Sequence, residues 1–270
     1  MLAAGIDGTY ELVDVAPDDL PRALERVREG YYLGCNVTMP YKESVVRLLD
    51  GLDDDAGIIR AVNTVTREGG RLVGHNTDSY GVRRTVEILM EGADPGSSSA
   101  VVVGAGGTGR AATYGLIRSG FRRIVVFNRH LERAERLVND FAQLGTDTQL
   151  LAQPLEEGAV ATELRAANLL VNASSVGLNS DESPLPASIL PPGIRVLDVV
   201  YSPRDTRLLR DARAAGAAAT ANGEPMVIHQ GARAFELWFE RSAPLDAMTS
   251  ALAAAMEARS RADSLAAPGR

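Results

Sequence analysis

A glycine-rich turn that directly follows an apolar run is the feature that most restricts how this chain can fold. Residues 101–109 read VVVGAGGTG and place glycines at the G-x-G-x-x-G spacing. Helical spacing comes next, followed by a second apolar run at residues 124–127. Such a turn lets the backbone approach a pyrophosphate, which then rests on unpaired N–H groups at the start of a helix. Glycines alone would indicate only a tight turn, but this context predicts a dinucleotide-binding loop.

Apolar runs alternate with helical patterns through the second half of the chain. They lie at residues 100–103, 124–127, 149–152, 169–171, 196–200 and 217–220. Continuous apolar strands that alternate with helices are typical of a parallel sheet covered by helices on both faces. We therefore expect residues 97–222 to form a Rossmann domain.

The first 92 residues mix short strands with helices and form a separate α/β region. We expect helices at residues 17–29, 43–49 and 79–91, and strands at 31–38, 61–66 and 72–74. Residues 92–99, GADPGSSS, form the clearest linker and mark a domain boundary. A last helical region runs from residue 226 to about residue 256, and the polar residues 259–270 are expected to form a flexible tail.

Composition excludes several classes of function. A formal charge of −7 and a pI near 5.1 argue against nucleic-acid binding, which requires a basic face. No apolar run is long enough to cross a membrane and no leader pattern follows Met1, so we expect a cytoplasmic protein. Cys35 is the single cysteine and is expected to be a small buried hydrophobe. The three histidines are far apart, so we expect no metal site.

The end of the second apolar run indicates which dinucleotide binds. NAD-binding domains usually place a carboxylate there to bind the ribose 2′-hydroxyl, but this chain has Asn128, Arg129 and His130. Arg129, with Arg133 one helical turn later, can pair with a 2′-phosphate. The sequence therefore favours NADP over NAD, although both arginines could instead be ordinary surface charges.

Two charged residues in the first region are candidates for proton chemistry. Lys42 ends the segment NVTMPYK at an expected helix start, where a positive field lowers an amine pKa and suits a general base. A solvated surface lysine is the simpler alternative. Asp78 begins another expected helix, which it could merely cap.

Several motifs, taken together and in order, resemble the shikimate dehydrogenase family from Gly5 to beyond Trp238. They lie at residues 36–42 (NVTMPYK), 61–64 (AVNT), 76–78 (NTD), 104–107, 128–129, 172–174 (NAS), 198–203 (DVVYSP) and 230–232 (QGA), with Phe235 and Trp238 following. The resemblance implies a substrate domain of residues 1–92, rejoined by residues 226–258, and an active site in the cleft between it and the Rossmann domain. It also implies NADP as cofactor and shikimate or 3-dehydroshikimate as ligand. We expect a monomer or a homodimer.

The same resemblance implies a role for individual residues. Lys42 and Asp78 would form the catalytic pair. Substrate would contact Asp78 and also Thr38, Asn63, Tyr201 and Gln230, with Asn36 a weaker candidate. Cofactor would contact Gly104, Ala105, Gly106, Gly107, Thr108, Asn128, Arg129, Arg133, Val199 and Gly223. Asp54 stands at a further cofactor position, but it could equally be a solvated helix charge.

The chain departs from the family in one respect. The family normally has a first strand and a Ser-x-Ser segment before the equivalent of Gly5, and this segment holds the substrate carboxylate. We expect weak substrate binding without it. The alternatives that remain open are a quinate or aminoshikimate dehydrogenase, an NADP-binding sensor without useful turnover, and a methylenetetrahydrofolate dehydrogenase.

Overall fold

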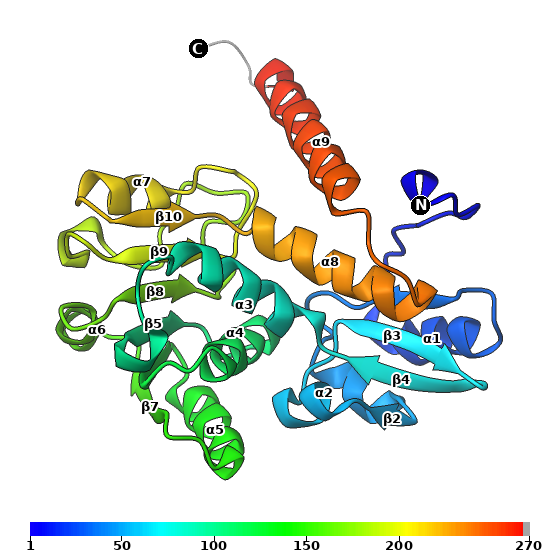
Figure 1. Cartoon of the computed structure of the whole chain (residues 1–270), viewed down its shortest axis with the longest axis horizontal. Helices are drawn as coiled ribbons and strands as arrows, with labels where there is room; N and C mark the ends of the chain where they lie inside the picture. The colour runs from blue at the N-terminus through cyan, green and yellow to red at the C-terminus, as the bar shows by residue number, and fades with distance from the viewer. Residues whose placement is uncertain (267–270) are drawn as a thin grey trace.

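The structure, a computed structural model, describes residues 1–266 and the side chains of residues 1–258. It contains a six-stranded and a four-stranded sheet, which lie at opposite ends of the view in Figure 1. Among the described residues, no helix combines the length and apolar composition that a membrane-spanning segment needs.

The six-stranded sheet is parallel throughout, as the apolar runs predicted. Its strands are β5 (Ser99–Val103), β6 (Arg123–Asn128), β7 (Gln149–Pro154), β8 (Leu169–Asn172), β9 (Arg195–Asp198) and β10 (Ala219–Ala221). They lie in the order β10-β9-β8-β5-β6-β7. Strands β6 and β7 therefore follow β5 on one side, and the chain then crosses over so that β8, β9 and β10 follow on the other side of β5. Ligands of such sheets bind at this reversal, outside the carboxyl ends of the strands.

Both faces of the six-stranded sheet are buried. The side chains of Val101 and Val103 belong to one apolar core, whereas that of Val102 belongs to another on the opposite face. This alternation explains why the strands read as continuous apolar runs. The covering helices include α4 (Gly107–Arg118), α5 (Leu131–Phe141), α6 (Glu157–Leu164) and α7 (Arg207–Ala214) (Figure 1).

The four-stranded sheet has the order β1-β3-β4-β2. Its strands are β1 (Gly34–Asn36), β2 (Gly51–Leu52), β3 (Thr64–Glu68) and β4 (Arg71–His75), and only the β2 and β4 pair is parallel. Gly69 and Gly70 join β3 to β4 with φ of 58° and 85°, as a two-residue hairpin turn requires. Helix α1 (Leu20–Arg28) packs on this sheet through a core that includes Leu24, Val27 and Leu72.

The strand predicted at residues 31–38 is shorter than expected. Only Gly34, Cys35 and Asn36 pair with β3, while Tyr31 and Leu33 are exposed. The pattern also missed strand β2 and helix α2 (Asp54–Ile59), because elements this short carry little periodicity.

Helices α3 (Thr77–Leu89) and α8 (Glu224–Phe239) connect the regions of the two sheets. Helix α3 packs against α4 and against α8. Helix α8 then reaches the four-stranded sheet, where Nε1 of Trp238 donates to the carbonyl of Val65 at 3.0 Å. Helix α9 (Leu245–Ala266) follows. It extends past residue 259, where we expected the tail to begin, while residues 267–270 lie outside the described part.

Candidate active site

The carboxylate of Asp78 lies against the amine of Lys42. Helix α3 begins at Thr77, and the side chain of Asn76 caps it by accepting a hydrogen bond from the N–H of Ser79 at 3.1 Å. The alternative in which Asp78 is the cap is therefore wrong, because Asn76 fills that position. Oδ2 of Asp78 instead lies 2.6 Å from Nζ of Lys42, and the two side chains are 5% and 13% exposed.

The backbone before Lys42 turns as predicted, but the expected helix after it is different. A 3₁₀ helix covers Ser44–Leu48, and Lys42 lies in the turn that precedes it. The prediction of an α-helix beginning at the lysine is therefore wrong. A 3₁₀ helix this short has few aligned peptide dipoles. The carboxylate of Asp78, and not a helix dipole, is consequently the main charge next to the amine of Lys42.

The buried amide of Asn63 connects Asp78 to two further polar side chains. Its Nδ2 lies 2.9 Å from Oδ1 of Asp78, 2.9 Å from Oγ1 of Thr77 and 3.1 Å from Oε1 of Gln230. Oε1 of Gln230 also accepts a hydrogen bond from Oγ1 of Thr77 at 3.2 Å. The carboxylate of Asp78 keeps lone pairs beyond these bonds and can accept hydrogen bonds from the hydroxyls of a ligand.

The glycine-rich loop lies beside this polar cluster. Gly104 has φ of 110°, and a Cβ at Gly109 would lie 2.1 Å from the carbonyl oxygen of Gly104, so the turn tolerates no side chain there. On the side that faces the four-stranded sheet, a Cβ at Gly107 would lie 2.9 Å from Cβ of Lys42. Oγ1 of Thr108 is 3.4 Å from Nζ of Lys42. The predicted nucleotide loop and the predicted proton-transfer residues are thus neighbours.

The end of β6 supports the loop and presents two arginines. Oδ1 of Asn128 accepts a hydrogen bond from the N–H of Ala105 at 3.2 Å. Arg129 is exposed, and Arg133 lies in the first turn of α5. Nη2 of Arg133 is 2.9 Å from Oε1 of Glu43, which lies in the region of the four-stranded sheet. The local pattern around Glu43 carries no signal that links this residue to a helix that begins far along the chain.

Comparison with known proteins identifies the family. Models match for the shikimate dehydrogenase substrate binding domain at residues 1–65, shikimate/quinate 5-dehydrogenase at 90–177, and the shikimate 5′-dehydrogenase C-terminal domain at 223–253. Shikimate dehydrogenase (NADP+) of Symbiobacterium thermophilum is 40% identical over 259 residues, which cover 94% of this chain and 87% of that relative. The chain belongs to the shikimate dehydrogenase family. This membership removes the methylenetetrahydrofolate dehydrogenase alternative.

Solved structures of the family share the fold. The enzyme from Thermus thermophilus, in complex with NADP(H) and shikimate, has a TM-score of 0.79 and 38% identity, and the match covers 93% of this chain and 89% of that one. Quinate dehydrogenase from Corynebacterium glutamicum, in complex with NAD, has a TM-score of 0.78 and 32% identity, with 87% and 83% covered. The two-domain α/β prediction is therefore confirmed.

Within this family fold, two of the predicted cofactor residues, Val199 and Gly223, lie together. A Cβ at Gly223 would lie 2.0 Å from the carbonyl oxygen of Val199, so only glycine fits there. Asp54 is exposed at the first position of α2, whereas Asp53 caps that helix and Asp55 accepts a hydrogen bond from Tyr114. The cofactor role of Asp54 stays a prediction.

Two predicted substrate residues lie outside the Lys42 cluster, and a third, Asn36, contacts it through the backbone carbonyl of Asn63. In the described part of the chain, no hydrogen bond joins the exposed Thr38 or the partly exposed Tyr201 to it. The side chain of Asn36 is already engaged, because it donates to Thr64 and to the carbonyl of Asn63 and accepts from Tyr10. Their contacts with substrate stay predictions.

The structure also reveals supporting residues that sequence reasoning did not separate from their motifs. Asp198, at the end of β9, is fully buried and accepts hydrogen bonds from Asn172 at 2.9 Å, Thr206 at 2.7 Å and the N–H of Val200 at 3.1 Å. Burial raises the pKa of Asp198 despite these bonds. The network fixes the loop after β9, which contains Val199. The sequence signal for this network was that two apolar strands, β8 and β9, each end in a polar residue, Asn172 and Asp198.

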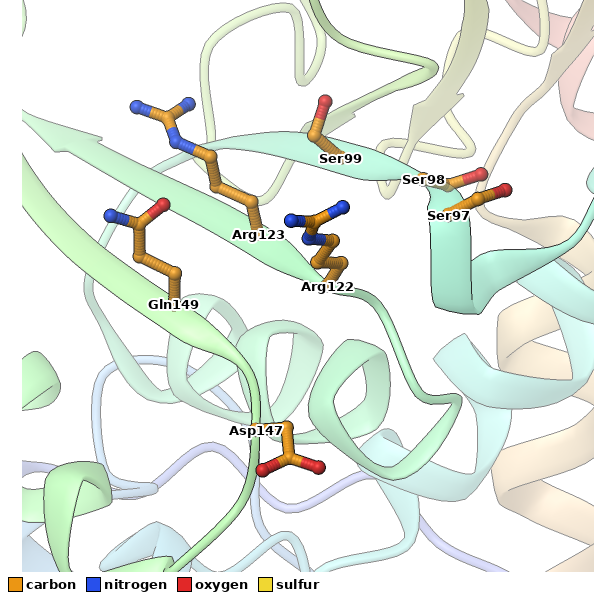
Figure 2. A pocket seen from close by; sticks show the side chains of 7 residues that line it. All are labelled: Ser97, Ser98, Ser99, Arg122, Arg123, Asp147 and Gln149. Carbon is orange, nitrogen blue, oxygen red and sulfur yellow. The ribbon is translucent and has the colours of Figure 1, made fainter.

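One cavity borders this cluster and another lies away from it. The first, of about 610 Å³, lies between the N-terminal segment and helices α8 and α9, and its largely apolar lining includes Gln230 and Asn36. The other, of about 390 Å³, lies at the start of β5, β6 and β7, opposite the glycine loop (Figure 2). Its Arg123 is paired with Glu163, and the hydroxyls of Ser97 and Ser98 donate to the carbonyl of Asp94. Of the two arginines in its lining, Arg123 is therefore the one whose guanidinium group is already paired with a carboxylate.

Cys35 has the character of a structural residue. Burial raises the pKa of its thiol to about 11, so the reactive thiolate is disfavoured. Within the part of the chain that the structure describes, no three His, Cys, Asp or Glu side chains are grouped so that they could hold a metal ion.

Proposed function

We propose that this chain catalyses the reversible, NADP-dependent interconversion of 3-dehydroshikimate and shikimate. The carrying observation is the buried ion pair of Lys42 and Asp78, whose Nζ to Oδ2 distance is 2.6 Å and which lies directly beside Thr108 of the glycine loop. Proton-transfer and hydride-transfer chemistry require such neighbouring sites. The relatives named above support the choice of reaction, because they are shikimate dehydrogenases that use NADP.

The residues at the glycine loop suit this cofactor. Gly104 and Gly109 let the backbone turn tightly, because a Cβ on either would meet backbone atoms of this chain, and Gly106 leaves open the space before α4, where N–H groups can bind a diphosphate. Arg129 and Arg133 supply positive charge at the end of β6, where residues 128–130 include no carboxylate. When bound, NADP supplies or accepts the hydride.

Lys42 performs the proton transfer in this proposal. During reduction its ammonium group donates a proton to the carbonyl oxygen of the substrate, and during oxidation its amine accepts the hydroxyl proton. Asp78 fixes the amine through Oδ2, while Asn63 fixes Asp78 through Oδ1 at 2.9 Å. Both oxygens of the carboxylate are therefore hydrogen-bonded, and Asp78 holds the amine of Lys42 in one orientation.

Substrate hydroxyls bind next to this pair. Asn63 precedes β3, Asp78 lies on α3 and Gln230 lies on α8, and the amide of Asn63 is within hydrogen-bonding distance of both other side chains. A ring that carries several hydroxyls matches such a set of closely spaced acceptors and donors. We assign Thr38 and Tyr201 to the remaining substrate contacts, because they lie in loops that follow strands β1 and β9.

Replacement of Lys42 by methionine tests the proposal. Lys42→Met should lower kcat by about 10² to 10⁴, the usual contribution of acid–base catalysis, while the Kd for NADP changes little. Activity is measured by NADPH absorbance with shikimate, and Kd by calorimetry. Wild-type turnover in a folded Lys42→Met protein would contradict the mechanism. NADP binding by both proteins, without turnover of any substrate tested, would favour the sensor.

The same assay decides substrate identity. Quinate and an aminoshikimate share the hydroxylated ring and acid group, so kcat/KM should be measured for all three compounds. We expect the highest value for shikimate. We also propose a cytoplasmic location, for which the acidic composition of the chain is the supporting observation.

A further inference from the structure

The guanidinium group of Arg133, which the proposed function assigns to the cofactor, pairs with a carboxylate of this chain. Its Nη2 lies 2.9 Å from Oε1 of Glu43, and the side chains are 40% and 46% exposed. Arg133 belongs to α5, beside the parallel sheet, whereas Glu43 directly follows Lys42 in the region of the other sheet. The pair therefore joins the regions of the two sheets.

This ion pair lies over the glycine-rich loop. A Cβ built on Gly106 would be 3.7 Å from Nη2 of Arg133 and 4.0 Å from Oε1 of Glu43. Gly106 is the residue that precedes α4, where the phosphates of a dinucleotide rest. A carboxylate is thus held close to a binding site for anions.

Displacement of the carboxylate by a phosphate is physically easy. Ion pairs that remain partly exposed are weak, because water screens both charges. A phosphate carries more charge than a carboxylate and also forms bidentate bonds with arginine. A 2′-phosphate can therefore take Arg133 from Glu43, and the freed carboxylate then lies near phosphate without a cation to neutralise it. NAD lacks the 2′-phosphate and leaves the pair intact.

We propose that Glu43 is a specificity-determining residue that competes with the cofactor 2′-phosphate for Arg133 and so reduces the preference for NADP over NAD. The inference rests on the proposed function, which assigns Arg133 to the 2′-phosphate. Removal of the Glu43 charge should strengthen NADP binding more than NAD binding. The effect should shrink as ionic strength rises, because salt screens the competing charges.

Calorimetric titration of the full chain with NADP and with NAD tests this proposal. Glu43→Gln should lower the Kd for NADP by about two- to fivefold, the range that a partly exposed ion pair can supply, and should change the Kd for NAD by less. The control is Glu135→Gln, which removes the same charge from an exposed position on α5. It should change the Kd values for NADP and NAD equally or not at all.

Arg133→Ala separates this inference from the proposed function. It should raise the Kd for NADP far more than the Kd for NAD, and in its background Glu43→Gln should no longer favour NADP. Suppose that Arg133→Ala acts selectively on NADP. The competition is then disproved, and the phosphate site stands, if Glu43→Gln leaves the NADP Kd unchanged, raises it, lowers both Kd values equally or has the same effect as Glu135→Gln. If Arg133→Ala affects NADP and NAD equally, Arg133 is not the phosphate ligand and both assignments fail.

Discussion

At the scale of single residues, the site depends on which side chain takes the helix cap. Asn76 accepts the hydrogen bond from Ser79 and also donates to the carbonyl of Ala61 at 2.8 Å. The first turn of α3 is therefore satisfied without Asp78. A carboxylate one position inside the helix can then pair with Lys42 and accept from Asn63, as a capping aspartate could not.

The thiol of Cys35 gives a prediction about pH at the same scale. Its pKa rises from an ordinary 9.0 to about 11, so folding favours the neutral thiol. The contribution of this group to stability is complete below pH 9 and is lost as the pH rises toward 11. At pH 9 only about 1% of it should be thiolate, compared with half of an unfolded cysteine. Iodoacetamide should therefore alkylate the native protein about 50-fold more slowly than the urea-unfolded protein. Equal rates would contradict the assignment.

At the scale of elements, the glycine loop is defined by backbone contacts. Gly104 needs a positive φ, while Gly109 packs against the carbonyl of Gly104. These requirements come from the passage of β5 into α4 and do not depend on which cofactor binds. The motif is consequently strong support for a nucleotide loop but does not choose between NAD and NADP, which depends on residues at the end of β6.

Gly109→Ala should abolish tight NADP binding while the protein still folds. The new Cβ would lie 2.1 Å from the oxygen of Gly104, so the loop must move. Gly158→Ala is the matched control, because a Cβ on that residue of α6 meets nothing within 4 Å. The control should keep its NADP Kd and gain about 0.5–1 kcal/mol of stability from its better helix propensity. Unchanged NADP affinity in Gly109→Ala would show that the loop is not used as proposed.

At the scale of the whole molecule, α8 packs on the four-stranded sheet after the chain has formed the six-stranded sheet. Trp238 donates to Val65 on β3, and Gln230 of the same helix reaches Asn63. One helix therefore anchors the sheet and supplies a side chain to the site. This arrangement makes the geometry of the substrate cluster dependent on packing between segments at opposite ends of the sequence.

Gly34→Ala tests this long-range packing. A Cβ at Gly34 would lie 2.2 Å from Nε1 of Trp238 and 2.5 Å from the oxygen of Val65, so α8 must separate from the sheet or shift along it. We expect a loss of about 1–3 kcal/mol in the free energy of unfolding, which overpacking typically causes. Trp238→Phe should cost about 1 kcal/mol, because it removes one hydrogen bond and keeps an aromatic ring. Urea denaturation measures both. A neutral Gly34→Ala would contradict the proposed contact.

The sequence by itself determined the parallel sheet and its nucleotide loop. Apolar runs of the right length, each followed by helical spacing, have one efficient way to bury both faces, and glycine is the only residue that tolerates the turn after β5. The hairpin at Gly69 and Gly70 could be predicted for the same reason. These features depend on local conformation and periodicity.

Tertiary structure alone decided the rest. The short elements β2 and α2 leave no periodic signal, and the helical spacing after Lys42 does not distinguish the 3₁₀ helix found there from the expected α-helix. Sequence proximity could not show that Asn76 leaves Asp78 free to pair with Lys42, or that Glu43 reaches Arg133 across a separation of 90 positions in the chain. Each of these depends on a distance between atoms that only the packed chain brings together, because hydrogen bonds and ion pairs act over a few ångströms.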